Sequence, residues 1–294
     1  MNKKRAVGLI AATLVGVCLL IGFMLKKQDT GYTVTQYPGS TGYQGSFYTI
    51  TDAAGHLIVI DGGWAMDADY VRGVIERYGN HVDAWIISHP HQDHAGAFNE
   101  IMAEPRGITV QTIYDNGFDY DFIESVGEPY DDIAIMENYQ ALTKNAGNVV
   151  HLKRGDVLDV CGLQLEVLNA YDDIVLENAG AEADYQNNAS LLLLVSAEQS
   201  SMLFCSDIKY NMESCLMQAL EAVRCDYVQV AHHGNWGFSL ETYLKLGAKG
   251  YFFDAPPGIV DVESFPAFAL KRDLIGAGKE TYDFYTGENK IILE

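Results

Sequence analysis

The sequence predicts an α/β protein folded as a four-layer αββα sandwich, with two sheets face to face and helices on both outer sides. Apolar strand-like runs alternate with amphipathic helical patterns along most of the chain. The second half also repeats the first: a hairpin that ends in an aspartate precedes a strand that ends in histidine. Two similar layers with polar residues at their strand ends are expected to share a site along one edge.

The strands of this predicted sandwich are short apolar or alternating runs that end at turn residues. One of them, residues 57–60, is continuously apolar, as expected of a strand that is buried on both faces. In the first half we expect strands at 47–51, 56–60, 82–88, 108–114, 149–152, 157–160 and 163–168. In the second half we expect them at 191–195, 202–205, 226–231, 250–253 and 290–293.

Helices are predicted where apolar residues recur at helical spacing. In segment 69–78, for example, Tyr70, Val71, Val74 and Ile75 share one face. The predicted helices are 69–78, 95–102, 133–144, 212–223, 240–246 and 265–274. The acidic segment 116–130 has no such pattern and is expected to be an irregular surface insertion.

The first 27 residues differ from the rest of the chain. A basic start is followed by 20 uncharged residues, 6–25, and by Lys26 and Lys27. As a helix this stretch is roughly 30 Å long, enough to cross a bilayer, and it exceeds the apolar core of a cleaved signal peptide, which has about 7–15 residues. We therefore expect one N-terminal transmembrane helix, an uncleaved signal anchor, with a secreted product of signal cleavage as the alternative. The basic start predicts that the remainder lies outside the cytoplasm.

Beyond the anchor we expect a tether and first strand at 28–45 and one large domain at 46–294. All 40 acidic residues but only 14 of the 19 Lys and Arg residues follow position 28. Such a negative domain repels polyanions, so we expect no strong binding of nucleic acid. The sequence does not indicate an oligomeric state.

Four cysteines follow the apolar stretch: Cys161, Cys205, Cys215 and Cys225. Their spacing matches neither a metal knuckle nor a small disulfide-stapled scaffold. Cys161 and Cys205 fall in apolar strand-like runs, where cysteine behaves as a small hydrophobic residue. We therefore expect buried free thiols.

Ligand-type residues are concentrated in the loop that follows the predicted strand 82–88. His89, His91, Asp93 and His94 stand within six positions, and imidazole and carboxylate are the ligands that divalent metals of the zinc type accept. His89 and His91 point the same way along extended backbone and can hold one metal. The chain turns at Asp93 and His94, and these two residues can hold a second metal. This density of ligands is hard to explain as core or as solvated surface, so the loop predicts a metal site.

With these residues, the chain resembles the metallo-β-lactamase superfamily over most of its length after the apolar stretch. The family pattern His-x-His-x-Asp-His after a strand matches the segment 88–96 without gaps, and its Asp-Gly-Gly element matches 61–63. The bridging aspartate of the family matches Asp207, and its last histidine matches the pair His232 and His233. The resemblance implies the metallo-β-lactamase fold and two divalent ions, with zinc expected and manganese or iron as alternatives.

The resemblance also implies roles for these residues. The expected metal ligands are His89, His91, Asp93, His94, Asp207 and His232. Of the histidine pair, His232 is favoured as ligand because it is nearer the strand end, which leaves His233 to contact substrate or protonate a leaving oxygen. Asp93, Asp207 and His233 form the expected catalytic set, around a hydroxide activated by two metals. Asp61 is expected to orient a ligand through a hydrogen bond. Trp236 is the candidate for an aromatic substrate contact.

The chain departs from the family pattern at one position. The family usually carries a further histidine before the strand that leads to the bridging aspartate, and here Asn187 and Asn188 stand in that place, while His151 comes too early. An Asn-x-x-Ser-Leu element with a later His-His-Gly is similar to two subgroups: the soluble domain of competence-type DNA-uptake channels and the phosphorylcholine esterases. Because an amide is a poor ligand beside imidazole, either asparagine could instead cap a turn.

These features predict an exported, membrane-anchored hydrolase, a phosphodiesterase acting on a phosphodiester or phosphocholine-type ester. Its substrate would be a small molecule or a cell-surface ester. A nuclease-like domain linked to DNA uptake is the first alternative, and the acidic charge opposes it. A lactone or β-lactam hydrolase is the second, because the same hydroxide suits either bond. A binding module on a degenerate hydrolase fold is the non-enzyme alternative.

Overall fold

The computed structural model describes residues 31–127, 131–178 and 184–294. The predicted membrane anchor at 1–27, with its apolar span 6–25, lies outside these ranges. Within the described ranges, no helix combines the length and the apolar character that a membrane crossing needs.

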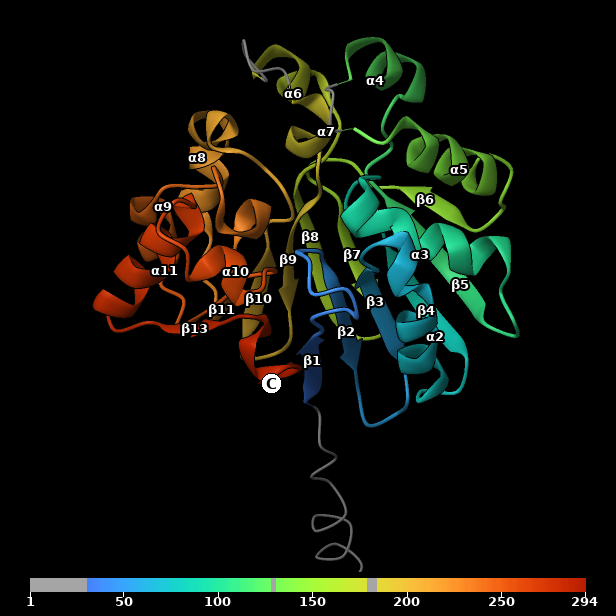
Figure 1. Cartoon of the computed structure of the whole chain (residues 1–294), viewed down its shortest axis with the longest axis horizontal. Coiled ribbons are helices and arrows are strands. Elements are labelled where there is room, and N and C mark those ends of the chain that lie inside the picture. The colour runs from blue at the N-terminus through green and yellow to red at the C-terminus, as the bar shows by residue number, and fades with distance from the viewer. Residues whose placement is uncertain (1–30, 128–130, 179–183) are drawn as a thin grey trace, which may run out of the picture.

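Two sheets of seven strands each form the centre of the molecule (Figure 1). The first sheet has the order β14 (Asn289–Leu293), β1 (Tyr32–Gln36), β2 (Phe47–Thr51), β3 (Leu57–Asp61), β4 (His81–Ile86), β5 (Thr109–Asp115) and β6 (Val149–His151). The second has the order β13 (Glu280–Tyr282), β12 (Gly250–Phe252), β11 (Tyr227–Gln229), β10 (Ser201–Phe204), β9 (Leu192–Ser196), β8 (Leu163–Asn169) and β7 (Val157–Val160). In both sheets the pairing is antiparallel on one side and parallel on the other, with β3 to β6 and β10 to β13 parallel.

Helices cover the outer sides of both sheets, which confirms the predicted sandwich (Figure 1). The first sheet carries α2 (Ala68–Glu76), α3 (Gln92–Ala103) and α5 (Ile133–Thr143). The second carries α8 (Glu213–Ala222), α9 (Leu240–Leu246), α10 (Pro257–Val260) and α11 (Pro266–Gly276). Three short helices lie along one edge of the sandwich: α4 (Tyr120–Val126), α6 (Asp173–Asn178) and α7 (Tyr185–Asn188).

The four layers enclose three apolar cores, one between the sheets and one under each helical layer. Strand β3 shows why its sequence is continuously apolar. Its residues Ile58 and Ile60 belong to the core between the sheets, while Leu57 and Val59 belong to the core under the helices of the first sheet. Because successive side chains alternate between faces, both faces need apolar residues here.

Several predicted boundaries differ from the structure. The segment 116–130 was expected to be irregular, yet it contains helix α4, which the Asp119 side chain caps by accepting from the Phe122 N–H. Helix α3 begins at Gln92 rather than at Ala95, so the aspartate and last histidine of the motif lie in its first turn. The tether continues into β1, which lies inside the first sheet between β14 and β2. The short elements β13, α6, α7 and α10 have too few residues for periodicity to reveal.

The four cysteines in the described part of the chain are free thiols, as predicted. Cys205 and Cys225 are buried, whereas Cys161 and Cys215 are partly exposed. The expected burial was therefore wrong for Cys215 and for Cys161. Cys161 follows strand β7 in a tight turn with a left-handed backbone at φ 54°, so its side chain is not part of the strand interior.

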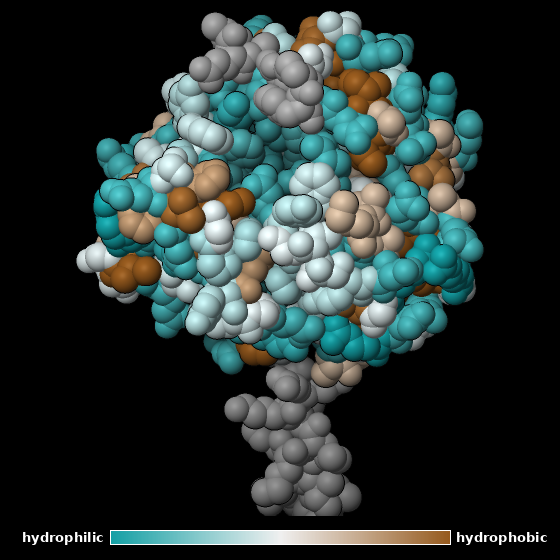
Figure 2. Space-filling view, viewed as in Figure 1, coloured by the Kyte–Doolittle hydropathy of each residue, from teal (hydrophilic) through white to brown (hydrophobic). Residues whose placement is uncertain are grey.

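The surface agrees with the acidic composition. The face shown in Figure 2 is mostly hydrophilic, with hydrophobic residues scattered over it rather than gathered in one broad patch. Scattered apolar residues of this kind are normal on a protein surface and indicate no interaction by themselves.

Candidate metal centre

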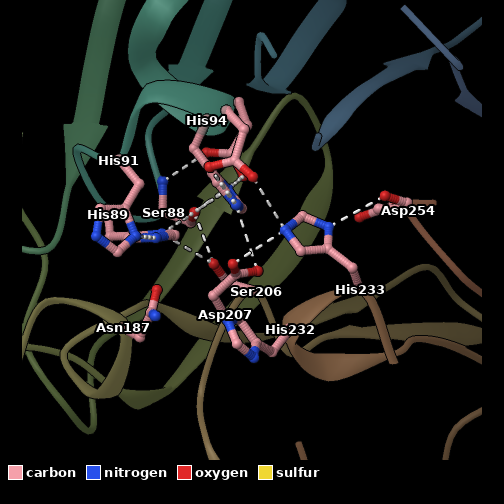
Figure 3. A network of polar contacts seen from close by, with 12 residues as sticks. Ser88, His89, His91, His94, Asn187, Ser206, Asp207, His232, His233 and Asp254 are labelled. Carbon is pink, nitrogen blue, oxygen red and sulfur yellow. Dashed lines mark hydrogen bonds and ion pairs between the residues drawn. The ribbon is translucent and has the colours of Figure 1, made fainter. Parts of the chain in front are cut away.

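Loops and turns at one edge of the sandwich bring the predicted site residues together (Figure 3). Asp61 ends β3, His89 follows β4 by a short loop, and His94 lies in the first turn of α3. From the second sheet, Asp207 follows β10 and His233 lies in the 3-10 turn after β11 (Ala231–Gly234). Parallel strands that end at the same edge place their following residues side by side, so the two halves of the chain each contribute part of one cluster.

In two histidines of this cluster, a contact at Nδ1 fixes the orientation of the ring. His94 Nδ1 lies 2.8 Å from Asp61 Oδ2, and His233 Nδ1 lies 3.1 Å from the backbone oxygen of Asp254. A ring nitrogen that faces an acceptor carries the proton, so in the neutral ring the lone pair is on Nε2. The position of Asp61 agrees with its expected role in orienting a histidine.

The Nε2 atoms of both histidines face carboxylate oxygens. His94 Nε2 is 3.3 Å from Asp207 Oδ1, and His233 Nε2 is 3.1 Å from Asp207 Oδ2 and 3.2 Å from Asp93 Oδ2. Among the described residues, His94 Nε2, His233 Nε2 and Asp207 Oδ1 are buried without a hydrogen bond of good geometry. A lone pair that faces a carboxylate in the interior requires a cation between them, either a proton or a metal.

In the protein without metal, the pKa values of these residues also show that the cluster needs a cation. Burial disfavours imidazolium, yet Asp207 and Asp61 raise the pKa of His94 well above its usual value. Burial opposes the charge of His233 as well, but mainly Asp207 raises its pKa to about 10. Burial alone would raise the pKa of Asp207, whereas His233 and His94 hold it well below its usual range. The site therefore stabilises positive charge at the centre of the cluster.

Within this cluster, two groups of three side chains have ligand atoms within 4.8 Å of one another: His89, His94 and Asp207, and Asp93, His94 and His233. Imidazole nitrogens and carboxylate oxygens are suitable donors for zinc, manganese or iron, so the residues present fit a divalent metal centre.

His89 and His91 lie next to this cluster, with His89 Nε2 2.8 Å from His91 Nδ1. Burial and the neighbouring rings of His94 and His91 lower the pKa of His89 well below its usual value, which keeps its lone pair available. The far nitrogen of His91, Nε2, is 2.6 Å from Asp131 Oδ1. Sequence reasoning missed Asp131, because it lies just after the acidic segment 116–130, 40 residues after His91, and no local pattern marks it.

The histidine pair is the main difference between the sequence-based assignment and the geometry. The sequence favoured His232 as the ligand, but the structure places His233 among the carboxylates, 1% exposed. His232 turns away, with its Nδ1 2.5 Å from the backbone oxygen of Asn235. Both residues have left-handed backbones, φ 51° and 56°, so the chain leaves the extended geometry from which strand proximity was argued.

This difference gives a direct test. We expect His233→Ala to lower metal content at least about tenfold more than His232→Ala, because of the two only His233 faces both Asp93 and Asp207. Elemental analysis of the two purified variants, side by side, measures the effect. A greater loss in His232→Ala would restore the assignment made from sequence.

Left-handed backbones are frequent around the cluster. Of the eight non-glycine residues with positive φ in the described ranges, five belong to the site or its rim: Asp61, Ser206, His232, His233 and Trp236. Such conformations cost free energy and gather where a fold must aim side chains at a functional site. At Asp61 and Ser206, the sharp turn ends a strand directly beside the cluster.

The two asparagines, Asn187 and Asn188, make different contacts. Asn187 Nδ2 donates to Asp184 Oδ2 at 2.8 Å, while its buried Oδ1 has no hydrogen-bond partner among the described residues and points toward His89 and His91 in Figure 3. Asn188 Oδ1 instead accepts from the backbone N–H of Lys209 at 3.2 Å, and so supports the loop after Asp207. The side-chain oxygen of Asn187 therefore borders the histidine-rich loop. His151 lies outside the cluster, at the end of β6 beside Asp115.

A cavity of about 320 Å³ opens beside the cluster. Asp93, Asp207 and Asn187 line it, together with Lys209 and Trp236. Lys209 Nζ lies 3.2 Å from Asp184 Oδ2, and Trp236 is 55% exposed. An exposed indole and a lysine beside a carboxylate-rich floor give the cavity both apolar and charged walls.

The model of the metallo-beta-lactamase superfamily matches residues 40–110, which contain Asp61 and the histidine-rich loop. In sequence, the chain is similar to ComE operon protein 3 of Bacillus subtilis, with 27% identity over 164 residues. That match covers 56% of this chain but only 18% of the relative, so the chain spans a small part of that protein's length.

Solved structures share the fold. The metallo-beta-lactamase fold protein YhfI from Bacillus subtilis has a TM-score of 0.57 at 12% identity, over 88% of this chain and 100% of that chain. CmlA, a diiron beta-hydroxylase from Streptomyces venezuelae, has a TM-score of 0.54 at 12% identity, over 89% of this chain and 54% of that chain. At such identities the likeness concerns the fold alone. The family match over residues 40–110, the sequence relative and the shared fold all support the resemblance of this chain to the metallo-β-lactamase superfamily.

Proposed function

We propose that this chain is a metal-dependent phosphodiesterase that acts on a small or cell-surface phosphodiester, such as a phosphocholine-type ester. One observation carries the proposal: the Nε2 atoms of His94 and His233 face the carboxylates of Asp207 and Asp93. In the neutral rings these Nε2 atoms carry no proton, so each presents a lone pair to a metal. When bound there, two divalent cations supply Lewis acidity and lower the pKa of a coordinated water. Zinc suits this donor set, and manganese or iron is the alternative.

The chain's own residues supply the remaining requirements. Lys209 is the basic side chain that we assign to the negative charge of a phosphoryl group, because it lines the cavity beside Asp207. His232 also lines the cavity, and its Nδ1 is engaged by Asn235, so its Nε2 is the atom available to exchange a proton with substrate. We therefore assign to His232 the contact with substrate and the protonation of a leaving oxygen, a role that the sequence had given to His233.

The cavity walls favour a small substrate with a cationic or apolar part. Trp236 presents an exposed indole at the rim, and an aromatic face attracts quaternary ammonium groups such as choline. Asp184 adds a carboxylate to the same wall. A long polyanion would instead meet the strongly acidic surface of the chain.

A hydrolysis screen of the purified chain tests the proposal. Metal-loaded protein is given a phosphocholine ester, a simple phosphodiester, DNA, a lactone and a β-lactam, with the isosteric variant Asp207→Asn as control. We expect the wild-type protein to hydrolyse the two small phosphodiesters and the Asp207→Asn control not to hydrolyse them. Turnover of the lactone or β-lactam alone would move the assignment to carboxylic ester or amide chemistry. Metal binding without turnover of any of the five would support a binding module.

A DNA-directed phosphodiesterase is the second candidate, and the match to ComE operon protein 3 favours it. The two candidates differ in substrate length and in salt response. Cleavage of DNA that weakens steeply with salt indicates contacts to several phosphates and would favour the second candidate.

We also propose that residues 6–25 anchor the chain in the cell membrane, with the catalytic domain outside the cytoplasm. The length of the uncharged stretch and the basic residues before it support this placement. Protease added to wall-stripped cells should remove the domain, and protection until lysis would contradict the orientation.

A further inference from the structure

A second group of metal-ligating side chains lies at the opposite end of the strands from the candidate centre. His56, Asp83 and Cys161 offer ligand atoms that all lie within 4.8 Å of one another. His56 directly precedes β3, the strand whose other end carries Asp61. Asp83 lies on the neighbouring strand β4, and Cys161 lies in the turn between β7 and β8 of the other sheet. Three segments far apart in the sequence thus meet at the base of the sandwich.

The three residues form a donor set of a specific chemical type. A thiol, an imidazole and a carboxylate together suit zinc, because thiolate excludes calcium and magnesium while the mixed set is common at zinc. In a tetrahedral zinc site with bonds of about 2.0–2.3 Å, ligand atoms lie roughly 3.3–3.8 Å apart. The ligand atoms here lie within 4.8 Å of one another, close to the spacing that a bound zinc needs.

Each of the three side chains is held by further contacts. Asp52 Oδ2 lies 2.7 Å from His56 Nδ1, and a carboxylate of this kind orients the ring of many metal-bound histidines. Asp83 Oδ2 accepts from the Leu57 N–H at 2.8 Å, while its Oδ1 lies 3.8 Å from His81 Nε2. The backbone oxygen of Cys161 accepts from Tyr32 Oη at 2.9 Å, which fixes the turn that carries the thiol. The exposed fraction of the His56 side chain is 45%, so an ion can enter from solvent.

The local charge also favours a cation. Burial and the carboxylates of Asp83, Asp52 and Asp159 raise the pKa of Cys161 to about 11. The same carboxylates stabilise a positive ion placed next to the sulfur.

We propose that His56, Asp83 and Cys161 form a third metal site, specific for zinc, that joins the base of the two sheets. It contains a thiol, unlike the cluster around Asp207, and it lies at the other end of the same strands. Three protein ligands leave one position of a tetrahedral zinc for solvent, which is the arrangement of an exchangeable ion. Since the ligands come from both sheets, a bound ion stabilises their packing against one another.

Cobalt substitution tests this site without reference to hydrolysis. Co²⁺ bound to a thiolate gives an intense charge-transfer band in the near ultraviolet, which a site made only of His and Asp cannot give. We expect the full-length chain loaded with Co²⁺ to show this band, Cys161→Ser to lose it, and Cys215→Ser, which alters another partly exposed thiol, to keep it. Zinc content should fall by about one ion per chain in Cys161→Ser and in His56→Gln, and alkylation of Cys161 should slow when zinc is added.

Several results would overturn the proposal. One is the absence of the band in the wild-type protein after loading. Another is a band that persists in Cys161→Ser. His56→Gln guards against a folding artefact, because it keeps the thiol and changes an exposed side chain; unchanged zinc content in that variant would also refute the site. Failure of the centre around Asp207 leaves these readouts unaffected, because that centre lacks sulfur.

Discussion

Asp207→Ala is expected to lose at least about a hundredfold in activity and most of its metal, since groups that only support ligands already cost about 10–100-fold when mutated. Asp207 is 2% exposed and is the residue that both His94 and His233 face. Its removal takes away the carboxylate that lies within 3.3 Å of both rings, whereas Asp93 lies 4.0 Å from the His94 ring. The measurements are hydrolysis of a small phosphodiester and metal content by elemental analysis.

Asn187→Ala is the matched control for this prediction. Asn187 is equally buried and borders the same cavity, but its amide oxygen only points toward His89 and His91, while its amide nitrogen is bonded to Asp184. We expect its loss to lower activity less than about tenfold. Asp207→Asn keeps the shape of the side chain and should be nearly as inactive as Asp207→Ala, which separates charge from packing. If Asn187→Ala is as inactive as the Asp207 variants, the amide is itself a ligand or a catalytic group.

Gly96→Ala is expected to destabilise the fold by about 3 kcal/mol, an effect typical of overpacking against atoms that cannot move. A Cβ on Gly96 would lie 2.4 Å from the Ala65 nitrogen and 2.8 Å from the Trp64 carbonyl carbon, and both are backbone atoms. Helix α3 therefore approaches the loop after β3 as closely as a glycine allows. Urea unfolding with an unchanged m-value would measure the loss.

The control is Gly73→Ala, in the exposed face of helix α2. A Cβ there meets nothing within 4 Å, so the change should stabilise the protein by about 0.5–1 kcal/mol through helix propensity. Gly96→Ala should also weaken metal binding, because displacement of α3 moves Asp93 and His94, which lie in its first turn. A Gly96→Ala protein as stable as the wild type would show that the helix can shift without cost.

The sequence alone predicted much of the fold, because layered α/β structure leaves periodic signals. The apolar run of β3 predicted a strand buried on both faces, and the two cores that it contacts confirm this. It could not reveal α7 or β13, since elements of three or four residues are shorter than the period that would identify them. The caps that Asp119 and Asp184 provide explain α4 and α7 better than any apolar pattern.

The candidate centre was predictable where its residues are close in sequence. The loop from His89 to His94 follows a strand, so local geometry alone forces its side chains to converge. Asp207 could be identified because it ends a hairpin in the second half, as Asp61 does in the first. Spacing and strand ends marked both positions, and the resemblance to the metallo-β-lactamase superfamily implied their roles.

Tertiary structure alone decided the rest. The choice between His232 and His233 depends on two left-handed residues, and backbone handedness at non-glycine positions leaves no mark in a sequence. Asp131 and Asp254 contact ligand-type histidines from 40 and 21 residues away, and His56, Asp83 and Cys161 meet from three separate segments of the chain. The sequence determined which chemistry was present at each strand end, whereas the packing of two sheets determined which ends meet, because contacts between distant segments are set by the global fold and not by local propensity.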